Sequence, residues 1–142
     1  SEFGAISSSH YVLLAVTITR AGRLRVARQQ GFTGGRGEVM LAAAAQAYIF
    51  FPGGFGTYDE LFEIVTLIAT GKMDRKVPVI LVGKEFWQPM IDWITKYAWD
   101  DNLFIDKHEL DLLQLVDSAE EAYAIVVEAV QNAGESASVN LS

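Results

Sequence analysis

Residues 49–63 read Ile-Phe-Phe-Pro-Gly-Gly-Phe-Gly-Thr-Tyr-Asp-Glu-Leu-Phe-Glu. An apolar run stops at Pro52, three glycines follow within four positions, and Thr57 opens a segment with helical apolar spacing. This pattern predicts a strand, a tight glycine turn and the start of a helix. The first N–H groups of a helix have no partner within it and can bind an anion. The turn is therefore a candidate phosphate site.

The segments around this turn predict an α/β fold. Apolar runs indicate strands buried on both faces, at residues 11–18, 47–51 and 77–82. Helical spacing indicates helices at 20–29, 38–46, 57–70, 85–97 and 118–132, with a helical turn at 106–113 and an extended link at 115–116. Strands that alternate with helices form a parallel sheet covered on both faces. We therefore expect a Rossmann-like α/β domain, shortened at its N-terminal end.

Three local signals set the expected boundaries. Gly71 is expected to stop the helix that follows the glycine turn, and Ser118 with Glu121 is expected to form a capping box for the last helix. Residues 1–9 are expected to be a tag remnant or disordered, 10–133 a single nucleotide-binding domain, and 134–142 a disordered tail. The glycines at 31–37 indicate a flexible loop.

Composition narrows the class of protein. The 142 residues carry a net charge of −7 and include no cysteine, so disulfides and cysteine metal sites are excluded. No apolar run has the length of a membrane span and no signal peptide is evident, which indicates a cytoplasmic protein. Residues 1–37 contain five arginines and one glutamate, whereas the rest is strongly acidic. An acidic body argues against nucleic-acid binding.

The glycine turn has two interpretations. Glycine can adopt positive φ and lets a phosphate oxygen approach the backbone closely, and Thr57 can add a hydroxyl donor. On this interpretation the phosphate-binding residues are Gly53, Gly54, Phe55, Gly56 and Thr57. The alternative is a plain tight turn between a strand and a helix.

The segment Pro52-Gly53-Gly54-Phe55-Gly56-Thr57-Tyr58-Asp59-Glu60 resembles the hallmark of the LOG family of cytokinin-activating phosphoribohydrolases. The run 47–72, the strand 78–83 and Phe86-Trp87 are similar to the longer bacterial members, and the resemblance extends over about 39–130. It implies hydrolysis of the N-glycosidic bond of a nucleoside 5′-monophosphate such as AMP, and a homodimer. The family is also labelled lysine decarboxylase, but no residue pattern here indicates a pyridoxal phosphate site, so no cofactor is expected.

In that chemistry positive charge builds on the ribose ring, and a nearby carboxylate stabilises it. The resemblance assigns this role to Glu60. The alternative is that Glu60, with Asp59 and Glu63, only complements the positive end of the helix dipole.

One part of the family pattern is missing. The family places an Arg-Lys pair on the preceding helix, where this chain has Gly37 and Glu38. Arg36 lies one position away and is the candidate second catalytic residue; its alternative is an ordinary solvated arginine. Three hypotheses follow: an active phosphoribohydrolase, a catalytically impaired nucleotide-binding protein of the same fold, and a structural remnant that keeps only a dimer surface.

The other candidate residues point to no further site. His10 and His108 lack metal-ligand spacing, so no metal is expected. Trp87, Trp93 and Trp99 are interpreted as core or interface residues rather than as base-stacking residues.

Overall fold

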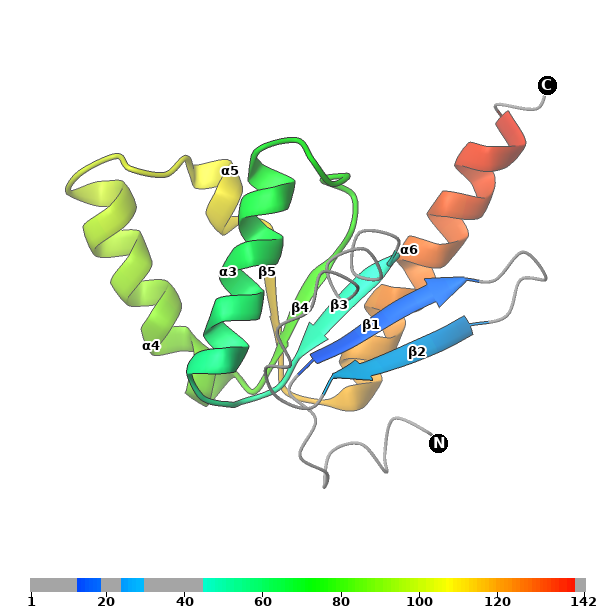
Figure 1. Cartoon of the computed structure of the whole chain (residues 1–142), viewed down its shortest axis with the longest axis horizontal. Helices are drawn as coiled ribbons and strands as arrows, with labels where there is room; N and C mark the ends of the chain where they lie inside the picture. The colour runs from blue at the N-terminus through cyan, green and yellow to red at the C-terminus, as the bar shows by residue number, and fades with distance from the viewer. Residues whose placement is uncertain (1–12, 19–23, 30–44, 140–142) are drawn as a thin grey trace.

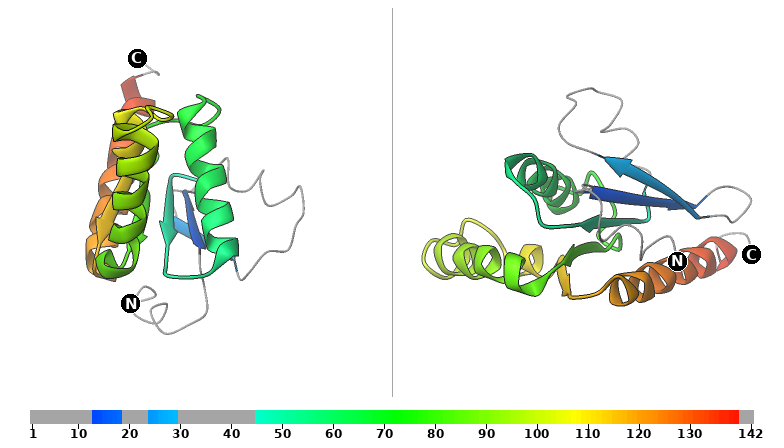
Figure 2. Two further views of the ribbon diagram at one scale, coloured as in Figure 1. Left: turned by 90° about the vertical axis from the view of Figure 1, so that its left-hand side faces the viewer. Right: turned by 90° about the horizontal axis from the view of Figure 1, so that it is seen from below.

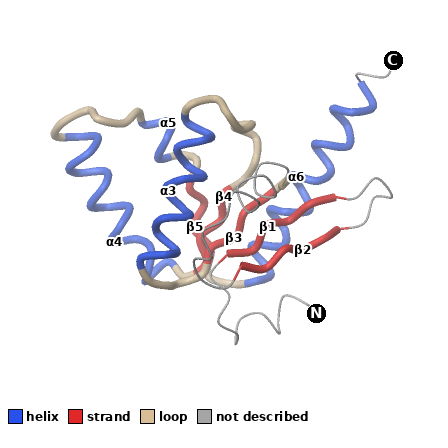
Figure 3. Tube along the Cα trace, viewed as in Figure 1, coloured by secondary structure: helices blue, strands red, loops and turns tan. Residues whose placement is uncertain are grey.

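The computed structural model describes residues 13–18, 24–29 and 45–139. Its centre is a five-stranded sheet with the order β2-β1-β3-β4-β5 (Figure 1). The strands are β1 Leu13–Ile18, β2 Leu24–Gln29, β3 Ala47–Phe50, β4 Val79–Val82 and β5 Leu113–Val116. The helices are α3 Phe55–Ala69, α4 Lys84–Ile94, the π-helix η1 Thr95–Asp100, α5 Lys107–Leu110 and α6 Ala119–Val139, and Figure 3 separates them from the strands by colour.

The strands β3, β4 and β5 are parallel neighbours, which confirms the predicted Rossmann-like α/β core. Their side chains alternate between two hydrophobic clusters, because successive residues of a strand face opposite sides of the sheet. Tyr48 and Phe50 pack with residues of α3 and α4, whereas Ala47 and Ile49 pack with residues of α6. Helices therefore cover both faces, and Figure 2 shows α3 and α6 on opposite sides of the sheet.

The sheet is mixed, which corrects the prediction for the N-terminal strand. Strand β1 pairs antiparallel with both β2 and β3. The helix predicted over 20–29 is also wrong, because residues 24–29 form β2 and pair with β1 over six positions. Only five residues separate β1 from β2, and a parallel crossover needs a dozen or more. A hairpin is the connection that fits, so tertiary pairing overrides the helical spacing.

The remaining helix predictions are close to the structure. Helix α3 begins at Phe55, two residues earlier than expected, and α4 ends at Ile94 with η1 continuing it to Asp100. The helical turn and extended link predicted near 106–116 are α5 and β5. Helix α6 continues past residue 134 as far as Val139. Within the described residues, no helix is long and apolar enough to cross a membrane.

Several expectations lie outside the described residues. These are the tag remnant at 1–9, the glycine loop at 31–37, Arg36, most of the helix expected at 38–46, and the last three residues of the tail. Ala45 and Gln46, at the end of that expected helix, are not helical.

Candidate functional site

The glycine turn lies at the carboxyl end of β3, where ligands bind in open parallel sheets. The residue that caps the start of α3 is Gly54, whose backbone is extended (φ −98°, ψ −155°). Its carbonyl accepts hydrogen bonds from the N–H groups of Thr57 at 3.1 Å and Tyr58 at 3.3 Å. The predicted order of strand, tight turn and helix start is therefore present.

The amides before Thr57 are the candidate anion donors. For the N–H groups of Gly53, Gly54, Phe55 and Gly56, the described part of the chain provides no hydrogen-bond acceptor. A Cβ built on Gly54 or on Gly56 would meet no heavy atom within 4 Å. As far as the described residues go, the turn thus leaves amide donors and open space together at the positive end of the dipole of a 15-residue helix.

The prediction that the glycines of this turn adopt positive φ is wrong. Among the described residues, positive φ occurs only at Leu103, Gly71 and Gly83, so the turn does not use the left-handed region. The absence of a side chain at Gly54 and Gly56 therefore matters for access to the backbone, not for its conformation.

Glu60 lies on the buried face of α3. Thr57 and Glu60 are three residues apart, which places them on the same side of a helix, and both are buried, at 2% and 9% exposure. Asp59 and Glu63 are exposed. A carboxyl group that only complemented the helix dipole would gain nothing from burial, since removing a charge from water costs free energy. The burial of Glu60 sets it apart from its acidic neighbours.

The turn that follows β4 adjoins the glycine turn, and the turn that follows β5 adjoins the turn after β4. Sequence reasoning missed the role of both. Gly83 follows β4 with φ of 103°, and a Cβ there would lie 3.4 Å from Cγ of Pro52. Asp117 follows β5, and its Oδ1 accepts a hydrogen bond of 3.0 Å from the N–H of Lys84. Residues that directly follow neighbouring parallel strands meet at one edge of the sheet, and this rule could have found them.

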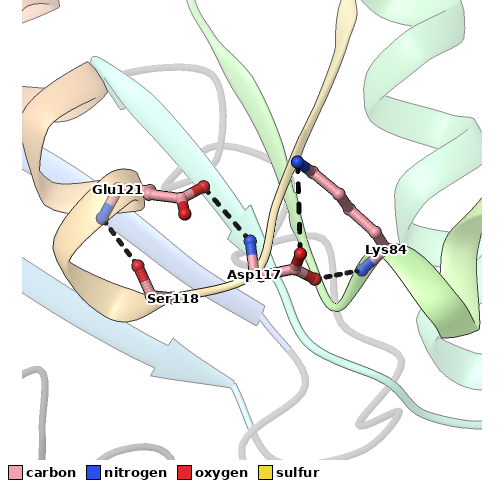
Figure 4. A network of polar contacts seen from close by, with 4 residues as sticks. All are labelled: Lys84, Asp117, Ser118 and Glu121. Carbon is pink, nitrogen blue, oxygen red and sulfur yellow. Dashed lines mark hydrogen bonds and ion pairs between the residues drawn. The ribbon is translucent and has the colours of Figure 1, made fainter.

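Figure 4 shows how Asp117 links the two turns. Its Oδ2 lies 4.0 Å from Nζ of Lys84, and its N–H donates to the Glu121 carboxylate at 3.3 Å. The N–H of Glu121 donates in turn to Oγ of Ser118 at 3.2 Å. Ser118 therefore caps α6 as predicted, although Glu121 reaches the N–H of Asp117 rather than that of Ser118.

Aromatic side chains join the start of α3 to the start of α4. The centroid of the Tyr58 ring lies 5.6 Å from that of the Trp87 ring and 6.3 Å from that of the Phe86 ring. Trp87 is fully buried, and its indole N–H donates to the carbonyl of Val82 at 3.1 Å. The prediction that Trp87 is a core residue is confirmed. Trp93 is 62% exposed and Trp99 is half-buried, so neither is a core residue.

An open amide cradle at a strand end, with a buried carboxyl group on the same helix, defines an α/β domain with a candidate site for a phosphorylated ligand. Comparison with known proteins narrows this class. A family model described as "Possible lysine decarboxylase" matches residues 35–126, and the chain belongs to that family. This match confirms the resemblance noted on the glycine turn.

One curated relative is similar over part of its length. It is the "Cytokinin riboside 5'-monophosphate phosphoribohydrolase" of Rhodococcoides fascians, 33% identical over 61 residues. That alignment covers 43% of this chain and 30% of the relative, so the chain spans about a third of the relative's length.

Proposed function

We propose that this protein hydrolyses the N-glycosidic bond of a nucleoside 5′-monophosphate such as AMP. The observation that carries the proposal is the pairing of an open amide cradle with the buried carboxyl group of Glu60 on one helix. The name of the curated relative supports this chemistry over the decarboxylation in the family description.

In the proposed reaction the 5′-phosphate lies against the amides of Gly53, Gly54, Phe55 and Gly56, with Thr57 beside them. Backbone donors at a helix start suit a phosphate dianion because both the N–H groups and the dipole favour negative charge. The binding energy of this remote group holds the ribose in a fixed position relative to Glu60.

Glu60 is the proposed catalytic carboxylate. As the bond from C1′ to the base nitrogen breaks, the bonding electron pair leaves with the base and positive charge grows on the ribose ring. A carboxylate in a partly desolvated place stabilises that charge more than one in water does. Water then bonds to C1′ and loses a proton, the base gains one, and ribose 5-phosphate is released.

A catalytically impaired nucleotide-binding protein is the second candidate. The observation that favours it is the occurrence of Gly37 and Glu38 where the family pattern has arginine and lysine. Loss of a positioned catalytic group typically lowers the rate by about two or more powers of ten. Arg36 is proposed as the substitute, and a protein in which it fails would bind AMP without turnover.

One assay distinguishes these candidates. The protein is incubated with AMP, and adenine and ribose 5-phosphate are quantified. For the enzyme we expect product, with kcat lowered roughly 100-fold or more in Glu60→Gln. Glu63→Gln is the matched control, because Glu63 lies on the same helix but is exposed, and its rate should equal that of the wild type.

The other outcomes are equally clear. AMP that raises the melting temperature without giving product supports the binding protein. If AMP is not cleaved and does not stabilise the protein, both candidates are contradicted. The hypothesis of a structural remnant that keeps only a dimer surface then remains.

A homodimer and a cytoplasmic location belong to the same proposal. Support for the dimer comes from an exposed aromatic surface, which we call the aromatic face. It consists of Phe62, Phe86, Trp93 and Tyr97, which are 37–62% exposed. Phe86, Trp93 and Tyr97 follow helical spacing along α4 and η1, and Tyr58 stacks on both Phe62 and Phe86. Grouped exposed aromatic residues are typical of protein interfaces.

A further inference from the structure

The amides of the glycine turn can bind an anion only if the turn keeps its shape, and the turn itself has few internal bonds. Among the described residues, its hydrogen bonds outside the regular ladder of α3 run from the N–H groups of Thr57 and Tyr58 to the carbonyl of Gly54. Within the described part of the chain, the Pro52 side of the turn is contacted by the turn that follows β4.

The turn after β4 contacts the glycine turn from two directions. Gly83 lies against the Pro52 ring so closely that a Cβ would come within 3.4 Å of Cγ. Three and four residues further on, the rings of Phe86 and Trp87 lie 6.3 Å and 5.6 Å from the Tyr58 ring, measured between ring centroids. A shift of Gly83 and the start of α4 would therefore move both ends of the glycine turn.

Gly83 is held in a conformation that other residues rarely adopt. Its φ is 103°, in the region that favours glycine. Its N–H donates to the carbonyl of Val116 at 2.8 Å, and the next N–H, that of Lys84, donates to Oδ1 of Asp117 at 3.0 Å. Two consecutive amides are thus fixed by two consecutive residues at the end of β5.

We infer that Asp117 is a positioning residue for the phosphate-binding turn. Through the N–H of Lys84 it holds the turn after β4, and that turn supports Pro52 and Tyr58. The effect on substrate rests on the proposed function, but the effect on the shape of the glycine turn does not. Asp117 acts through its hydrogen bond, because its ion pair with Lys84 is long, at 4.0 Å, between two half-exposed side chains.

The variants separate the hydrogen bond from the charge. Asp117→Ala removes the acceptor, whereas Asp117→Asn keeps an oxygen at the same place without the charge. Lys84→Ala removes the ion pair and leaves its own N–H bonded to Asp117. Ser118→Ala is the matched control for stability, since it removes the cap of α6, and Figure 4 draws no hydrogen bond or ion pair between Ser118 and Lys84.

The first measurement is the ¹H–¹⁵N spectrum of the full chain without ligand. We expect the amide signals of Gly53, Gly54 and Gly56 to shift in Asp117→Ala and to keep their wild-type positions in Asp117→Asn, Lys84→Ala and Ser118→Ala. If Asp117→Ala does not fold, Asp117→Glu replaces it, because the longer side chain displaces the acceptor and keeps the charge.

The second measurement is AMP hydrolysis. In Asp117→Ala we expect KM to rise roughly tenfold or more, because the altered turn binds the phosphate of AMP more weakly. We expect a smaller change in kcat, because the phosphate is remote from the bond that breaks. Asp117→Asn should restore the wild-type KM.

Two results would overturn the inference. One is an Asp117→Ala protein whose glycine-turn amides and KM match the wild type. The other is an Asp117→Asn protein as altered as Asp117→Ala, which would make the charge the important property. A wild-type protein that neither binds nor cleaves AMP contradicts the proposed function instead, and the amide spectra still decide the role of Asp117.

Discussion

At the scale of single residues, Gly54 and Gly56 leave the backbone accessible, and Gly56 does so at a cost in helix stability. Neither needs positive φ, and a Cβ at either position would meet no atom within 4 Å. At Gly56, inside α3, stability alone would therefore favour alanine, whereas at the N-cap position of Gly54 glycine is the better residue of the two. Glycine in a helix costs about 0.5–1 kcal/mol relative to alanine, which is a cost that binding of a ligand to the amides would explain.

Gly56→Ala is expected to raise the free energy of unfolding by up to about 1 kcal/mol and to weaken AMP binding. A methyl group beside the amide blocks one hydrogen bond to a charged oxygen, which is roughly tenfold or more in Kd. Gly134→Ala is the control, because Gly134 also lies in a helix with open space around it. Chemical denaturation and calorimetric titration measure both effects. Equal AMP affinity in the two variants would contradict the cradle.

Tyr48 predicts a loss of stability at alkaline pH. Burial raises the pKa of its hydroxyl from 10.0 to about 12, and the Ala45 backbone offsets only part of this. The folded state therefore keeps the proton that the unfolded state loses, so stability is complete below pH 10 and falls as the pH rises towards 12.

The fall should amount to at most about 3 kcal/mol and be absent in Tyr48→Phe. Urea unfolding at a series of pH values measures it. Tyr97→Phe is the control, since Tyr97 is 47% exposed. If the fall in the free energy of unfolding at high pH persists in Tyr48→Phe and disappears in Tyr97→Phe, Tyr97 and not Tyr48 is its source.

At the scale of elements, glycines flank α3 at both ends and have different structural roles. Gly54 starts it and leaves amides open, whereas Gly71 ends it with φ of 74°. The N–H of Gly71 donates to the carbonyl of Ile68, and that of Lys72 donates to the carbonyl of Leu67. These two bonds form a Schellman motif, which confirms the predicted helix stop.

Gly71→Ala is expected to cost about 1 kcal/mol of stability, because alanine in the left-handed region is strained. Gly71→Asn should cost less, since asparagine tolerates this region better. Both variants should cleave AMP like the wild type if the wild type is active, because Gly71 is at the far end of α3 from the glycine turn. Thermal unfolding gives the first comparison, and an unchanged melting temperature in Gly71→Ala would contradict it.

At the scale of the whole molecule, the three parallel strands bring separate turns to one edge. The glycine turn, Gly83-Lys84 and Asp117 lie far apart in sequence and meet there because β3, β4 and β5 are neighbours. The residues of the aromatic face come from α3, α4 and η1. Helix α6 lies on the opposite side of the sheet from α3 (Figure 2).

Charge on the aromatic face is expected to dissociate the proposed homodimer. Phe62→Glu combined with Trp93→Glu places two like charges on each copy, which a close interface does not tolerate without partners. Tyr123→Glu is the control, because Tyr123 is an exposed aromatic residue on α6. Sedimentation velocity measures the mass. A monomeric wild type, or a double variant that remains dimeric, would contradict this use of the face.

The sequence alone determined the parallel core, the glycine turn and the position of Glu60 one helical turn beyond it. These features depend on local patterns: apolar runs, helical spacing and glycines between them. The hairpin of β1 and β2 and the meeting of Gly83, Pro52 and Asp117 were decided only by the tertiary structure. Pairing partners and contacts between turns join residues distant in sequence, and local propensity carries no information about which of them the sheet will bring together.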